Sequence, residues 1–375
     1  MNITEGLSYD DVLLVPKYST IKSRDEVDTS VKLPKIGTTL KHPIIPANMK
    51  SVAGYNLAVE LIKSGGLYIH HRFEDIGHQT GIFHELKKQF IEDVSDRFGF
   101  SVGVKEDQFK LVDYLVDMIG ARILCVDVAH GDSLNCHVMC EYIAKKYPKV
   151  LLIAGNVVTG EAAVRMWNCG VDICKIGVGS GSICTTRIQT GNGMPTMTTI
   201  SNVAKAKEEC MHISSLSLEK FHGHLRQPNL YFSTYFNVFK EQKQFPKEMM
   251  FIADGGIKTS GDICKSLCFA NMVMVGNLFA GTEESPGEKI VKDRVTYKKH
   301  SGSSTHKSSY VEGVEGYVKC EGKFNDVLEG LLQGLRSGMS YQNAKTLEEL
   351  RKYPEFVKIT NSGLIESHAH DLKYF

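Results

Sequence analysis

The residues best suited to chemistry lie between Lys175 and Pro195, in the run KIGVGSGSICTTRIQTGNGMP. Its glycines free the backbone for conformations closed to other residues. Such a loop can turn carbonyl oxygens toward a monovalent cation or N–H groups toward a phosphate. Cys184 lies in this loop, near glycine residues and threonine hydroxyls, and could be a nucleophile. The alternative is a small buried thiol, which we expect for most of the other nine cysteines.

Two further glycine motifs follow apolar runs. Asp254-Gly255-Gly256 and Gly276-Asn277 could bind a phosphate on backbone N–H groups, with the carboxylate accepting hydrogen bonds from ribose hydroxyls. Asp-Gly is also a common turn dipeptide, so the sequence Asp-Gly-Gly alone does not indicate a binding site. Its position directly after a predicted strand is what favours that interpretation. Cys136, His137 and Cys140 could suggest a metal site, but their spacing fits one face of a helix and we interpret them as structural.

These motifs need a scaffold, and the sequence predicts one. Short apolar runs alternate with segments such as residues 56–65, 110–120 and 160–170, in which apolar residues return every three or four positions. We expect eight parallel strands: Ile44–Pro46, Leu67–His70, Phe100–Gly103, Ile123–Asp127, Leu151–Ala154, Ile173–Ile176, Phe251–Ala253 and Met272–Val275. Polar and glycine residues follow these runs, where a (β/α)8 TIM barrel places its active site. A doubly wound open sheet would give the same alternation.

Two segments depart from this repeat. Residues 206–247 are longer than an ordinary crossover and rich in aromatic residues and histidine, which indicates an insertion. Residues 281–323 have little apolar periodicity and many Gly, Ser, Lys and Glu residues. We expect them to form a mobile flap over the barrel mouth. The chain is otherwise interpreted as one catalytic domain spanning residues 1–375.

Composition narrows the function classes. The 375 residues include 44 basic and 43 acidic side chains and no long basic run, which argues against nucleic acid as a partner. No stretch reaches about 18 uninterrupted apolar residues, and the N-terminal residues lack an apolar signal core. Cysteines inside apolar runs are typical of a reducing compartment. We therefore expect a cytoplasmic enzyme.

Several motifs together resemble the IMP dehydrogenase/GMP reductase family of (β/α)8 purine-nucleotide enzymes. They are SVGVKED at 101–107, VDVAHGDS at 126–133, IAGNVVTGEAA at 153–163, GSICTTR at 181–187, IADGG at 252–256 and MVGNLFAGTEESPGE at 274–288. HPIIPANM at 42–49, HRF at 71–73 and SVGVKED are more similar to the reductases, whereas the C-terminal stretch from residue 313 is more similar to bacterial dehydrogenases. Only about thirty residues separate His71 from Val102, too few for the paired regulatory CBS domains of many dehydrogenases.

The resemblance implies that Cys184 attacks C2 of a purine nucleotide. A dehydrogenase would then hydrolyse the adduct with an Arg-Tyr pair that follows a Gly-Ser motif on the flap, here Gly302-Ser303. No Arg lies between Gly302 and Glu312, and Arg294 and Tyr297 precede that motif. The expected activity is therefore NADPH-dependent reductive deamination of GMP to IMP and ammonia. IMP dehydrogenase activity with NAD, or a purine-nucleotide-binding relative without turnover, are the alternatives.

The resemblance also implies roles for individual residues. Thr186 and Glu312 would relay a proton, with Glu315 as the alternative carboxylate. Substrate would contact Asn48, Met49, Ser182, Asp254, Gly255, Gly256, Gly276, Asn277, Gly302 and Ser303, although family members carry Ser or Gly at position 277. The nicotinamide cofactor would contact Arg72, Asp127, Ala129, His130, Gly131 and Asn156. Carbonyls of Gly179, Gly181 and Cys184 would face a potassium ion, joined by Glu366, Ser367 and His368 of a neighbour in a homotetramer.

Overall fold

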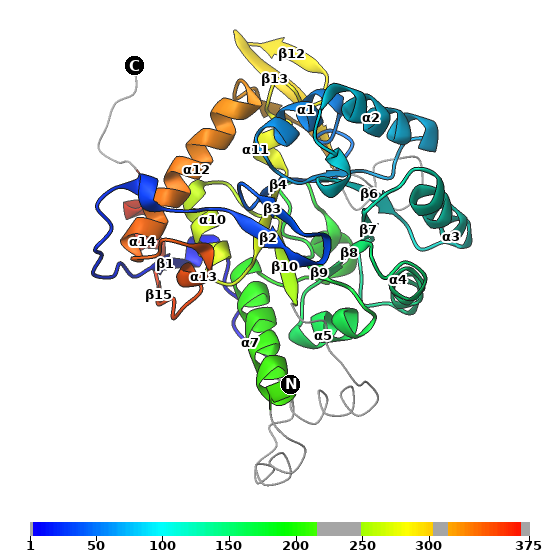
Figure 1. Cartoon of the computed structure of the whole chain (residues 1–375). Helices are drawn as coiled ribbons and strands as arrows, with labels where there is room; N and C mark the ends of the chain where they lie inside the picture. Colours follow the sequence, from blue (N-terminus) through cyan, green and yellow to red (C-terminus); the bar gives the residue numbers. More distant parts are fainter. Residues whose placement is uncertain (1–2, 216–248, 303–313, 369–375) are drawn as a thin grey trace.

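The computed structural model describes residues 3–215, 249–302 and 314–368. Eight parallel strands form one sheet in the order β4-β11-β10-β9-β8-β7-β6-β5. Its two end strands, β4 and β5, also lie in contact, so the sheet is nearly closed into a barrel (Figure 1). The strands are β4 (Ile44–Pro46), β5 (Tyr68–His70), β6 (Phe98–Val102), β7 (Ile123–Asp127), β8 (Leu151–Val157), β9 (Ile173–Ile176), β10 (Met250–Asp254) and β11 (Met272–Val275). The predicted (β/α)8 barrel is confirmed.

A helix follows each strand and covers the outside of the barrel (Figure 1). These helices are α1 (Tyr55–Lys63), α2 (Ile76–Gln89), α3 (Glu106–Asp113), α4 (Leu134–Lys146), α5 (Gly160–Asn168), α7 (Thr196–Ser215), α10 (Ser260–Leu267) and α12 (Phe324–Tyr341). Strand and helix apolar side chains form one buried core, with Phe98, Phe100 and Trp167 among its largest members. Both faces of each strand are therefore buried, which is why the strands are almost entirely apolar.

Shorter elements complete the chain. Near the N-terminus, β2 (Val31–Leu33) pairs with β3 (Thr38–Leu40), and β1 (Val12–Leu14) pairs antiparallel with β15 (Phe356–Lys358). The other α-helices of the described residues are α6 (Thr186–Thr190), α11 (Asn277–Ala280), α13 (Leu347–Leu350) and α14 (Asn361–Glu366). No helix among the described residues is long and apolar enough to cross a membrane.

The two predicted departures from the repeat differ in structure. Residues 206–215 continue helix α7, and most of the remaining predicted insertion lies outside the described residues. The predicted flap contains an antiparallel sheet of β12 (Lys289–Lys292), β13 (Val295–Ser301) and β14 (Glu315–Lys319). Between β5 and β6, the described chain holds one α-helix, α2.

Candidate active site

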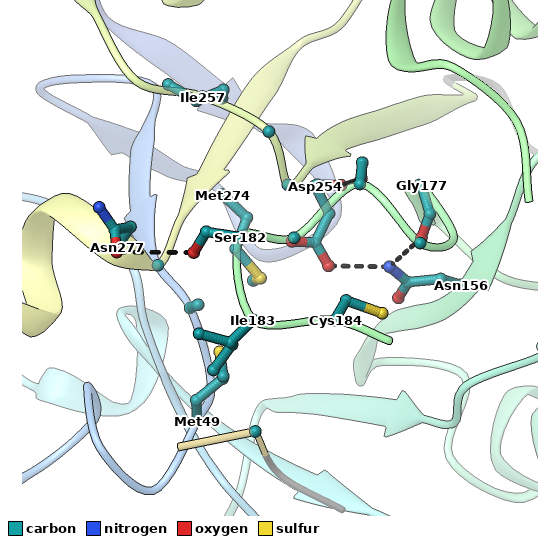
Figure 2. Close-up of a pocket in the computed structure, with 18 of the residues that line it drawn as sticks. Met49, Asn156, Gly177, Ser182, Ile183, Cys184, Asp254, Ile257, Met274 and Asn277 are labelled. Atoms are coloured by element: carbon teal, nitrogen blue, oxygen red, sulfur yellow. Dashed lines mark hydrogen bonds between the residues drawn. The ribbon is translucent and has the colours of Figure 1, made fainter. Parts of the chain in front are cut away.

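A cavity of about 270 Å³ opens at the carboxyl ends of the barrel strands. Asn156 of β8 and the loops after β4, β9, β10 and β11 contribute to its wall (Figure 2). His300 and Gly302 of the flap contribute as well. Many of the predicted site residues line it: Met49, Asn156, Gly179, Gly181, Ser182, Cys184, Asp254, Gly255, Gly256, Gly276, Asn277 and Gly302. The barrel therefore brings together residues that are more than 250 positions apart in the sequence.

The loop after β9 places Cys184 at this cavity. Gly177 begins the loop with φ +141°, and a Cβ there would lie 2.1 Å from the carbonyl oxygen of Asp254, so only glycine fits. The Cys184 N–H donates to the carbonyl of Gly181 over 3.1 Å. Its Sγ lies 3.2 Å from Oγ1 of Thr186, the buried first residue of α6. The predicted nucleophile and the predicted threonine are thus in contact.

Asp254 and Asn156 form one wall of the cavity. The Asn156 side-chain amide donates to Asp254 Oδ2 over 2.8 Å and to the Gly177 carbonyl over 2.7 Å, which fixes the carboxylate beside the cysteine loop (Figure 2). Gly255 and Gly256 follow with φ +96° and +81°. Ser182 Oγ and Asn277 Oδ1 lie 3.5 Å apart in another part of the wall, and both residues are exposed. A carboxylate and exposed polar groups fit a ribose and a phosphate, respectively.

The flap sheet is joined to the cysteine loop by its backbone. The Val314 N–H donates to the Ile183 carbonyl over 3.0 Å, and the Gly302 N–H donates to Val314 over 3.3 Å. His300 also lines the cavity, and its Nδ1 lies 2.7 Å from Ser51 Oγ. Burial lowers the pKa of His300 to about 4, so the ring is neutral at pH 7. Ser303 and Glu312, predicted to bind the base and relay a proton, lie outside the described residues.

The predicted cofactor residues are arranged in a second group, at the ends of β5 and β7. Arg72 Nε donates to the Asp127 carbonyl over 3.1 Å, while Ala129 and His130 are exposed. The Gly131 N–H donates to the Asn156 carbonyl over 2.8 Å. The cofactor group is therefore connected to the cavity wall through the backbone of Asn156. Of the predicted cofactor residues, only Asn156 lines the cavity.

Asn48 lies outside the cavity lining although we predicted a substrate contact. It is buried, donates to Ser101 Oγ over 3.0 Å and accepts from Lys175 Nζ over 3.1 Å. Sequence reasoning gave no role to Ser180, Ile257, Lys258 and His300, which line the cavity, or to Lys175, which lies beneath it. A lysine inside the apolar strand run ICKI was the one signal that could have identified Lys175.

Glu366, Ser367 and His368 are exposed at the end of α14 and do not line the cavity of their own chain. Cys136 and Cys140 are buried with free thiols on α4. Eight of the ten cysteines are buried, and Cys184 is half-buried together with Cys320. Burial raises the pKa of Cys125 and of Cys264 to about 12, which suppresses thiolate formation at these core positions.

One histidine cluster resembles a metal donor set. Nε2 atoms of His70, His71 and His78 each lie 3.3–3.4 Å from a carboxylate oxygen of Glu74. The Phe73 N–H, however, donates to Nδ1 of His71 over 3.1 Å, so the proton of the neutral ring is on Nε2. The Nε2 atom that faces Glu74 Oε1 at 3.4 Å therefore has no lone pair for a metal ion, and we interpret the cluster as a polar group of the loop that carries Arg72.

Comparison with known proteins shows the family of this chain. A family model described as IMP dehydrogenase / GMP reductase domain matches residues 6–215 and 232–370. The chain belongs to the IMP dehydrogenase/GMP reductase family. It is 35% identical to a GMP reductase of Bacillus licheniformis over 363 residues, covering 94% of this chain and 96% of the relative. A GMP reductase of Lactobacillus gasseri is 37% identical over 356 residues, with 92% and 93% covered.

Membership in the family confirms the resemblance based on the sequence motifs. The two matched ranges leave residues 216–231 unmatched, inside the predicted insertion. A GMP reductase of Bacillus subtilis is likewise 35% identical, with 94% of this chain and 96% of the relative covered. Similarity therefore extends over nearly the whole of both chains, including the cavity and the loops that line it.

Proposed function

We propose that this protein is a GMP reductase, which converts GMP and NADPH to IMP, ammonia and NADP. The observation that carries the proposal is the position of Cys184, which lines the cavity with its Sγ 3.2 Å from the Thr186 hydroxyl. The similarity to proteins named GMP reductase supports the same assignment.

The residues of the cavity suit each part of this substrate. Asp254 would accept hydrogen bonds from the ribose hydroxyls, and the backbone of Gly255, Gly256 and Gly276 would bind the 5′-phosphate with Ser182 and Asn277. Gly302 and Ser303 would contact the base, with Met49 packing against it. These contacts would hold purine C2 against Cys184.

The reaction then divides into two steps. The Cys184 sulfur forms a bond to C2 of GMP, and the bond from C2 to the exocyclic nitrogen breaks, releasing ammonia. Thr186, in contact with the sulfur, would pass a proton from Glu312 toward the departing nitrogen. Bound NADPH supplies the hydride that reaches C2. The carbon–sulfur bond breaks as IMP forms, and Cys184 regains its electron pair.

The flap favours a reductase over a dehydrogenase. A dehydrogenase needs a group to activate water, yet Arg294 lies in the turn between β12 and β13, exposed and outside the cavity lining. Glu315, the alternative relay carboxylate, lies 2.8 Å from Lys299 Nζ in an ion pair. The Glu315 side chain also lies outside the cavity lining. IMP dehydrogenase activity remains the second candidate because both enzymes belong to the family.

The residues also fit the other groups that the family implies. Arg72, with the exposed residues Ala129 and His130, would hold the nicotinamide cofactor beside Asp127 and Asn156. Carbonyl oxygens of Gly179, Gly181 and Cys184 are hard ligands that suit potassium. Glu366, Ser367 and His368 would complete that site in a neighbouring subunit of a cytoplasmic homotetramer.

Two assays followed by nicotinamide absorbance test the proposal. GMP with NADPH should give steady oxidation of NADPH, whereas IMP with NAD should give at best a burst without sustained XMP formation. Replacing Glu312 with Gln should lower turnover about 10²–10⁴-fold with little change in GMP affinity. Sustained XMP formation from IMP would contradict the reductase assignment and favour the dehydrogenase.

A further inference from the structure

Lys175 is a buried cation beneath the candidate site. It lies on β9, between β8 and β10, and only 2% of its surface is exposed. Its Nζ lies 2.7 Å from Asp127 Oδ1, 3.1 Å from Asn48 Oδ1 and 3.4 Å from Asp254 Oδ2. The ammonium therefore contacts residues from three other parts of the barrel. They are Asp127 at the end of β7, Asp254 at the end of β10 and Asn48 in the loop after β4.

The two carboxylates belong to different groups of the site. Asp254 lines the cavity, whereas Asp127 lies in the cofactor group, where its own carbonyl accepts from Arg72. Among the described residues, Lys175 is the lysine or arginine that forms ion pairs with both. Because the two carboxylates share one ammonium, a change at either of them changes how strongly Lys175 pairs with the other.

The charges make this connection strong. Burial alone would lower the pKa of Lys175, but Asp127 and Asp254 outweigh it and raise that pKa above its ordinary value. Burial would likewise raise the pKa of Asp127, yet Lys175 reverses the effect and lowers it. The ammonium and the Asp127 carboxylate are therefore charged at neutral pH. Removing one partner of a buried ion pair leaves an uncompensated buried charge, which is costly, so an ammonium that still has a second carboxylate within reach should pair with it.

Accessibility separates the roles of the three residues. Side-chain exposure is 3% for Lys175 but 18% for Asp127 and 19% for Asp254. Lys175 is also absent from the cavity lining. A ligand can therefore contact the carboxylates from the barrel mouth, while the ammonium stays covered beneath them.

We propose that Lys175 is a positioning residue that couples the nucleotide and cofactor sites by sharing its ammonium between Asp254 and Asp127. The identity of the two ligands rests on the proposed function. With both carboxylates charged, Lys175 is held mainly by Asp127, at the shorter distance. The Asp254 carboxylate then keeps lone pairs for the hydroxyl groups of a nucleotide.

Asp127→Asn gives the decisive test, because Asp127 does not line the cavity. Without that charge, Lys175 should pair fully with Asp254 and compete with the ribose hydroxyls. We expect the affinity for GMP, measured by calorimetry in the absence of cofactor, to fall by about fivefold or more, within the usual range of coupling between sites. In a Lys175→Met background, where no ammonium can shift to Asp254, Asp127→Asn should cause no loss of GMP affinity.

Lys298 offers a matched control, since it is also fully buried but its ammonium contacts backbone carbonyls, including that of Thr282 at 2.7 Å. In Lys298→Met, Asp127→Asn should weaken GMP binding by the same factor as in the wild-type protein. Should Lys175→Met fail to fold, the Asp127→Asn measurement still decides. If the wild-type protein binds and reduces GMP, but Asp127→Asn binds GMP with unchanged affinity, this inference alone is overturned. A wild-type protein that does not bind GMP would overturn it together with the proposed function.

Discussion

Replacing Gly177 with Ala tests how the cysteine loop is built. The new Cβ would lie 2.1 Å from the Asp254 carbonyl oxygen, whereas real contacts of this kind are not shorter than 3.0 Å. The loop and the β10 end must therefore separate by about 0.9 Å, the difference between those two distances. The φ of +141° adds backbone strain of about 1–3 kcal/mol in any residue other than glycine.

This displacement would reach the proposed ribose site. The Gly177 carbonyl also accepts a hydrogen bond from the Asn156 amide, and that amide holds the Asp254 carboxylate. A misplacement of about 1 Å can lower turnover about 10²-fold. We expect Gly177→Ala to reduce kcat for GMP reduction by that order and to lower the free energy of unfolding by a few kcal/mol. Nicotinamide absorbance and urea unfolding measure the two effects.

Gly191→Ala is the matched control. Gly191 lies at the end of α6 with φ +69°, and a Cβ there would have nothing within 4 Å. Only the left-handed backbone penalty of about 1–2 kcal/mol remains, and turnover should stay near that of the wild-type protein. If Gly177→Ala were as active and as stable as Gly191→Ala, the close contact with Asp254 would not position the catalytic loop.

Three further predictions address the thiol, pH and assembly. Cys184→Ala should abolish turnover while calorimetry still detects GMP binding, because the proposed phosphate and ribose contacts come from other residues; lost binding would indicate a structural thiol. Burial lowers the pKa of His42 and of His300 to about 4, so the folded protein binds fewer protons than the unfolded chain between about pH 4 and 6.5. The free energy of unfolding should therefore fall as pH drops from 7 to 5, by up to about 1.4 kcal/mol per pH unit for each histidine, and urea unfolding that shows equal stability would contradict this. Light scattering should show a tetramer, and a monomer at all working concentrations would refute the neighbour-completed potassium site.

The barrel could be predicted from the sequence because its signal is local. Four predicted strands, Ile44–Pro46, Ile123–Asp127, Ile173–Ile176 and Met272–Val275, have the bounds of β4, β7, β9 and β11. Each is a short apolar run buried on both faces, so composition alone marks its ends. Of the 20 residues that line the cavity, 12 are predicted site residues, and most of these 12 lie at or just after the ends of barrel strands.

The parts that were missed depend on contacts between distant residues. The flap sheet is largely exposed along β12 and β14, so its strands lack the apolar signal of the barrel strands. It is stabilised instead by cross-strand pairing and by the buried ammonium of Lys298. The partners of Lys175 lie 48, 79 and 127 positions away, and no local pattern indicates them.

The most direct test of the central claim is to count products in one reaction. GMP labelled with ¹⁵N at its exocyclic amine should be incubated with the protein and NADPH, and ammonia, oxidised cofactor and purine product quantified together. If the adduct on Cys184 is resolved by hydride, labelled ammonia, NADP and IMP should form in equal amounts. Labelled ammonia accompanied by XMP, with NADPH unchanged, would show that water resolves the adduct and would contradict the proposed reductase.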